Sequence, residues 1–139
     1  MAAYACTGCS AHKPQPPEAK DGTIDLSKWD FARDGSAALR GEWIFKWGEF
    51  VEPQPEDFLE PKTSDLINIT TTWNDHAAAE ETGAATYLLR IILPTALATQ
   101  ELAFQSGKAS TAATWRIIDS DTAHVLGTVS QGTAHVQKK

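Results

Sequence analysis

The sequence predicts an all-β sandwich, and three observations indicate this fold class. Apolar and polar residues alternate with a period of two, as along residues 23–26, which is typical of a half-buried strand. Short apolar segments recur at intervals of about 8–12 residues, and turn residues separate them. Apolar residues make up 42% of the 139-residue chain and charged residues 22%, which is the composition of a globular domain.

Aromatic residues dominate the strand expected at residues 39–47. The side chains of Trp43, Phe45 and Trp47 share one face of this strand, because successive side chains point to opposite faces. Three such rings could form a surface on which a sugar stacks. Aromatic residues on one strand face more often fill the core of a sandwich, so we expect these three in the core.

The segment 85–94 is the strongest strand of the sequence. Its apolar residues fall on both faces, which predicts a central strand covered on both sides and ended by Pro94. Arg90 is costly to bury in such a strand unless it is paired, so it indicates either a structural ion pair or a ligand for an anion. Shorter strands are expected at residues 66–69, 101–106, 112–118 and 124–129, and a short helical turn is expected at the end of the proline-interrupted loop 52–58.

The beginning of the chain is expected to be a tether rather than part of the fold. Three prolines lie within residues 14–17, and they forbid a helix and favour an extended linker. We therefore expect residues 1–22 to be a disordered tether and residues 23–139 to form one domain.

The two cysteines, Cys6 and Cys9, both lie in this tether. No second cysteine pair completes the four ligands of a zinc site, so no metal site is expected. The four residues 7–10, Thr-Gly-Cys-Ser, resemble the end of a bacterial lipoprotein signal, in which Cys9 would be lipidated. Two free thiols in a flexible tail are the alternative.

Charge and motif content exclude several classes of function. Twelve basic and eighteen acidic side chains give a net charge of −6, which disfavours nucleic acid as a partner. No serine lies in a nucleophile elbow, the four histidines lack metal-ligand spacing, and the carboxylates are scattered. The sequence therefore argues against an enzyme, and no cofactor is expected.

A loop that begins at Trp73 has the composition of a small-molecule or carbohydrate site. Asn74, Asp75 and His76 follow the indole directly. An aromatic face can stack on a ligand while a few polar groups fix its orientation. The alternative is that Trp73 covers the end of the core. We expect Trp73, Asn74, Asp75 and His76 to bind the ligand, and Arg90 to anchor it if the ligand is acidic.

Five motifs occur in the order seen in one family of bacterial proteins. Residues 39–48 resemble its "L-x-G-x-W-x-F-x-W" strand, and residues 55–58 match its "P-x-D-F" turn. Trp73 matches the tryptophan of "P-x-x-W", residues 83–94 resemble "G-x-A-T-Y-R-L-x-I-x-L-P", and residues 127–129 resemble "G-x-V-G". The chain thus resembles the extracytoplasmic sensor domains of receptors that have seven transmembrane segments and diverse intracellular signalling modules.

This resemblance implies a jelly-roll β-sandwich of the galactose-binding type. In the family several strands follow the "G-x-V-G" element, so we expect the closing strands of the sandwich to lie beyond residue 139. The implied function is recognition of a carbohydrate or small carboxylate outside the cytoplasm, in the periplasm or at the cell surface. The signal would pass to a membrane-embedded signalling module that is not part of this chain.

Two other functions remain open at this point. Related jelly rolls precede the catalytic barrels of β-galactosidase-like enzymes, so the chain could be the accessory sugar-binding domain of a glycoside hydrolase. It could also be a stand-alone lipoprotein with a structural or interaction role.

Overall fold

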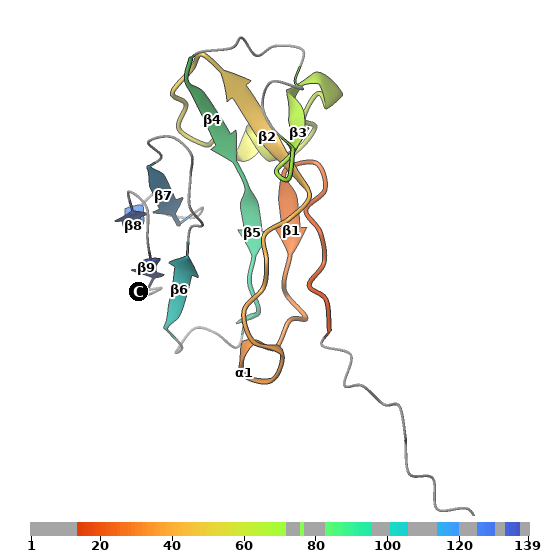
Figure 1. The fold of residues 1–139 in the computed structure, drawn as a ribbon, viewed down its shortest axis with the longest axis vertical. Helices are drawn as coiled ribbons and strands as arrows, with labels where there is room; N and C mark the ends of the chain where they lie inside the picture. Colours follow the sequence, from red (N-terminus) through yellow and green to blue (C-terminus); the bar gives the residue numbers. More distant parts are fainter. Residues whose placement is uncertain are drawn as a thin grey trace, which may run out of the picture. The chain divides into compact units, whose positions relative to one another are not determined.

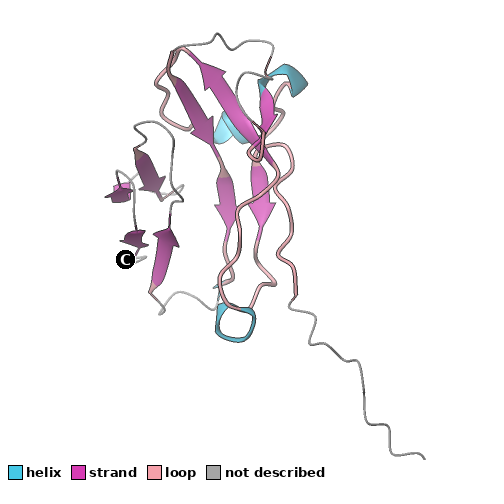
Figure 2. Ribbon diagram, viewed as in Figure 1, coloured by secondary structure: helices cyan, strands magenta, loops and turns pink. Residues whose placement is uncertain are grey.

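The computed structural model describes residues 14–71, 76, 83–95, 101–105, 114–119, 125–129 and 133–136. Within these residues the secondary structure is mostly β, with nine strands, one four-residue helix and two 3₁₀ turns (Figures 1 and 2). This confirms the predicted all-β class. The chain divides into two compact units, Met1–Pro94 and Thr95–Lys139, where one domain was expected.

A three-stranded antiparallel sheet forms the centre of the first unit. Strand β2 (Glu42–Trp47) lies between β3 (Leu66–Asn68) and β4 (Ala85–Leu88), and Figure 1 shows the three strands side by side. Trp43 and Phe45 are 5% and 2% exposed, which confirms that they belong to the core. On the opposite face of β2, Ile44 is buried at 1% exposed, Lys46 is half-buried and Glu42 is exposed. The other apolar residues that bury most of their surface in this unit are Ala19, Ile24, Leu26, Trp29, Ile44, Ile67 and Leu88.

A two-stranded parallel sheet is also present in this unit, formed by β1 (Thr23–Asp25) and β5 (Arg90–Ile92). Backbone pairing begins before β1, inside the segment expected to be a tether. Ala19 is buried, and its amide donates to the carbonyl of Arg40 over 2.7 Å. Its carbonyl accepts from the amide of Glu42 over 2.9 Å. The end of the tether, expected at residue 22, therefore lies too late in the chain. The composition of a short polar segment does not reveal that its backbone pairs with a distant strand.

The strand expected at residues 85–94 is divided into β4 and β5. The amide of Arg90 donates to the carbonyl of Gly22 over 2.8 Å, so the chain leaves β2 and pairs with β1. Ile92 and Leu93 are 37% and 40% exposed. The prediction of a single strand covered on both sides is therefore wrong, because apolar residues on both faces do not identify the neighbours of a strand.

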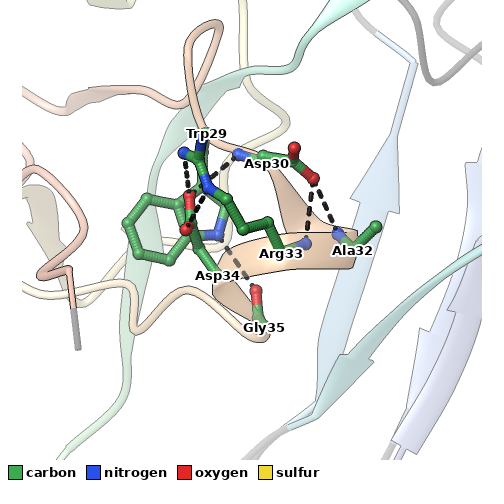
Figure 3. Close-up of polar contacts among 6 residues, drawn as sticks. All are labelled: Trp29, Asp30, Ala32, Arg33, Asp34 and Gly35. Carbon is green, nitrogen blue, oxygen red and sulfur yellow. Dashed lines mark hydrogen bonds and ion pairs between the residues drawn. The ribbon is translucent and has the colours of Figure 1, made fainter. Parts of the chain in front are cut away.

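A short helix, α1 (Phe31–Asp34), was not predicted. The carboxylate of Asp30 caps it by accepting from the amides of Ala32 and Arg33, each over 3.0 Å (Figure 3). The indole of Trp29 donates to the carbonyl of Gly35 over 3.0 Å. An aspartate before the turn and a glycine after it are the sequence signals of such a helix.

The segment that follows β2 carries the expected helical turn, η1 (Pro55–Phe58). A second turn, η2 (Thr63–Asp65), leads directly into β3. Because β3 pairs with β2, this second turn places Asp65 beside the last residues of β2.

The described residues of the second unit form two antiparallel pairs. Strand β6 (Leu102–Gln105) pairs with β9 (Thr133–Val136), and β7 (Trp115–Ile118) pairs with β8 (Val125–Val129). The strands expected at residues 101–106, 112–118 and 124–129 are confirmed with narrower bounds. Strand β9 was not predicted.

Candidate functional site

An open pocket of about 410 Å³ lies at the carboxyl end of β2 in the first unit. This volume is within the range of small-molecule sites, which is about 300–1,000 Å³. Its walls combine aromatic rings with charged groups, and the described residues that line it are Phe45, Lys46, Trp47, Glu49, Asp65 and His76.

Phe45 forms the aromatic base of this pocket. Its ring packs edge-on against Tyr87 of β4, with ring centroids 5.1 Å apart, and stacks on Trp47 at 6.1 Å. The imidazole of His76 lies over Phe45, with the ring centroids 4.6 Å apart. Phe45 is too buried to stack on a ligand, whereas Trp47 and His76 are half-buried. These two rings are therefore the ones that a ligand can reach.

Trp47 is held in place by the close approach of Gly83. A Cβ atom on Gly83 would lie 2.6 Å from Cζ2 of the indole, which is shorter than any ordinary contact. Only glycine lets the backbone pass so close to the ring. Trp47 was expected to be a core residue, but its partial exposure places it at the edge of the pocket instead.

An ion pair forms the polar side of the pocket. Nζ of Lys46 lies 2.9 Å from Oδ2 of Asp65, and the two side chains are 29% and 33% exposed. Lys46 comes from β2, whereas Asp65 comes from the end of η2. Glu49 adds a second, exposed carboxylate to the lining. The ammonium donates hydrogen bonds and the carboxylates accept them, so the pocket can hold a polar ligand between charged and aromatic groups.

Of the two candidate ligand-binding residues that the structure describes, one lies at this pocket. His76 lines it, whereas Arg90 lies exposed on β5 and is not among the lining residues. Because Arg90 is exposed, it does not carry the desolvation cost that its place in a central strand would have imposed. Trp73, Asn74 and Asp75 lie outside the described residues, as does the candidate lipidation residue Cys9.

Five of the six described lining residues were not predicted as site residues: Phe45, Lys46, Trp47, Glu49 and Asp65. Trp47 was assigned to the core because it alternates with Phe45. Asp65 pairs with a residue 19 positions earlier in the chain, and no local pattern predicts such a contact. The available signal was the run Lys46-Trp47-Gly48-Glu49, in which charged and aromatic residues flank a glycine at the end of the expected strand.

Within the described part of the chain, no group of three or more histidine, cysteine, aspartate or glutamate side chains could hold a metal ion. The helices among those same residues include none that is long and apolar enough to cross a membrane. Comparison of the chain with protein-family models, with curated proteins and with solved structures gives no match.

Proposed function

We propose that this chain is an extracytoplasmic ligand-binding sensor domain of a bacterial membrane signal-transduction protein, with a jelly-roll fold of the galactose-binding type. The observation that carries the proposal is the pocket at the end of β2, where accessible aromatic rings meet an ion pair. The same strand carries the "L-x-G-x-W-x-F-x-W" pattern on which the family resemblance depends. The all-β structure supports the same reading.

The proposed ligand is a carbohydrate or a small carboxylate. Trp47 and His76 supply aromatic faces for its apolar side, and Lys46 and Asp65 supply a donor and an acceptor for its polar groups. Trp73, Asn74 and Asp75 join the proposal because they precede His76 directly in the sequence. Binding would stabilise one conformation of the domain, and a membrane-embedded module would respond to that change in population.

A thermal-shift screen of neutral sugars and small carboxylates tests this function. A ligand at about a hundred times its Kd stabilises the protein by roughly 2.7 kcal/mol, which raises the melting temperature by several degrees. His76→Ala should lose this shift, because the imidazole lines the pocket. Leu59→Ala is the control, since Leu59 is 72% exposed and does not line the pocket. It should keep the full shift.

The same screen separates a binding role of Trp73 from a role in covering the core. If Trp73 binds the ligand, Trp73→Ala should lose the ligand-induced shift while the melting temperature without ligand stays nearly unchanged. If Trp73 covers the core instead, Trp73→Ala should lower the melting temperature both with and without ligand. If no compound shifts the parent protein, the proposal of a ligand-binding domain is wrong. A response to oligosaccharides alone would favour the accessory domain of a glycoside hydrolase.

A further inference from the structure

The geometry points to Asp65 as the residue that determines which ligand charge the pocket accepts. Because its carboxylate is paired with the ammonium of Lys46, the pocket selects against anions. This inference rests on the proposed function and narrows it, since it favours neutral ligands over carboxylates. It concerns the ion pair that lines the pocket, in which Nζ of Lys46 and Oδ2 of Asp65 are 2.9 Å apart.

The charges around the pocket support this selection. Lys46 is the one cation among the described lining residues, and Asp65 and Glu49 are carboxylates. Among these described residues the two carboxylates outnumber the one ammonium. An anionic ligand could reach the ammonium only beside the carboxylate that already accepts from it, so its attraction to Lys46 is offset by repulsion from Asp65. A hydroxyl group meets no such repulsion, because it can accept from the ammonium and donate to the carboxylate.

The position of the pair is fixed by the sheet. Lys46 is held opposite Thr86 of β4, and Asp65 directly precedes Leu66, which pairs with Ile44 of β2. Lys46 thus lies on β2, and Asp65 lies next to a residue that pairs with β2, so the sheet fixes the backbone of both. A pair that is about one-third exposed contributes little to the stability of the fold. Asp65→Asn is therefore expected to fold, and a change in its selectivity can be measured.

Matched ligands test the selectivity directly. Glucose and galactose are compared with glucuronate and galacturonate on the parent protein and on Asp65→Asn. In the parent the neutral sugar should bind more tightly than its uronate. Asp65→Asn frees Lys46 and should shift this ratio of affinities toward the uronate by roughly tenfold. Glu56→Gln removes the same charge from a residue outside the pocket lining and should leave the ratio unchanged.

A second measurement needs no ligand and reads the charge beside Trp47. Iodide and caesium quench tryptophan fluorescence, and the ratio of their quenching constants reports the local potential. The contribution of Trp47 is isolated by subtracting the Trp47→Phe variant in each background. At constant ionic strength, Asp65→Asn should raise the iodide-to-caesium ratio for Trp47 roughly twofold, whereas Glu56→Gln should not.

The outcomes separate this inference from the proposed function. If no sugar or carboxylate of the thermal-shift screen binds, the proposed function fails, and the quenching ratio still decides whether Asp65 controls the charge beside Trp47. If the parent binds a uronate more tightly than the neutral sugar, the selection against anions is wrong although the domain binds ligands. An unchanged quenching ratio in Asp65→Asn also overturns the inference.

Discussion

Individual side chains on β2 have different surroundings even where their spacing is identical. Trp43, Phe45 and Trp47 alternate regularly, yet the first two are buried and the third is half-buried. The alternation predicted which residues share a face, and this was sufficient to predict the core at Trp43 and Phe45. It could not predict how far along the strand that face is buried, because the residues that pack on it are distant in the sequence. Gly83, which packs against Trp47, is an example.

Replacing Trp43 by alanine should lower the free energy of unfolding by about 3–5 kcal/mol, because the ring is 5% exposed and the substitution leaves a cavity. Urea unfolding measures this loss. Phe50→Ala is the control: Phe50 is 89% exposed, so its loss should cost less than about 0.5 kcal/mol. A loss below about 1 kcal/mol for Trp43→Ala would place that ring at the surface.

The carboxylate of Asp34 makes the stability of α1 depend on pH. The hydrogen bond from the Arg33 guanidinium, 2.7 Å long, lowers the pKa of Asp34 below its ordinary value of 3.8. A lowered pKa means that the stabilisation is complete above the ordinary value and is lost as the pH falls through the lowered one. Asp34→Asn should therefore melt below the parent at pH 7, and the difference should shrink at about pH 3.

Arg33→Gln is the matched variant for this test, because it removes the donor that lowers the pKa. Its melting temperature should also approach that of the parent as the pH falls. A difference between Asp34→Asn and the parent that stays constant between pH 7 and pH 3 would contradict the assignment.

The positions of the strands were predicted more reliably than the strands with which they pair. Hydrophobic alternation and turn residues located most strands, with ends one or a few residues too long. The division of residues 85–94 into β4 and β5 could not be predicted, because it depends on a change of partner from β2 to β1. The same limit explains the tether boundary. Ala19 pairs with backbone about twenty residues later, and its own sequence context is that of a linker.

Gly22 offers a test of this packing at the start of the fold. Its φ is +76°, and a Cβ atom there would lie 2.6 Å from Cγ1 of the buried Ile44. Gly48 has a similar φ of +71° but has no atom within 4 Å of the added Cβ. Both alanine variants carry the strain of a positive φ, so their difference isolates the clash.

Gly22→Ala should be less stable than Gly48→Ala by about 1–3 kcal/mol, the usual cost of overpacking a core. Chemical unfolding of the two variants gives this difference. Equal stabilities would mean that Gly22 does not pack on Ile44, and they would support a tether that extends to residue 22.

The whole molecule consists of two units, Met1–Pro94 and Thr95–Lys139, and the pocket belongs to the first. Composition and strand spacing predicted the all-β class, but they did not predict this division, which follows from the pairing of strands. The candidate site shows the same contrast. The sequence pointed to His76, whereas the pairing of Lys46 with Asp65 required the arrangement of η2 beside β2.

A small ligand is proposed to bind at the carboxyl end of β2. Titrating the ¹⁵N-labelled chain with the screened sugars and carboxylates, while recording its amide and indole NMR signals, tests this most directly. Saturable changes are expected at the amides of Lys46, Trp47 and Glu49 and at the Trp47 indole, and His76→Ala should weaken them. Saturable changes confined to residues outside the pocket, or none with any compound, would contradict this proposal.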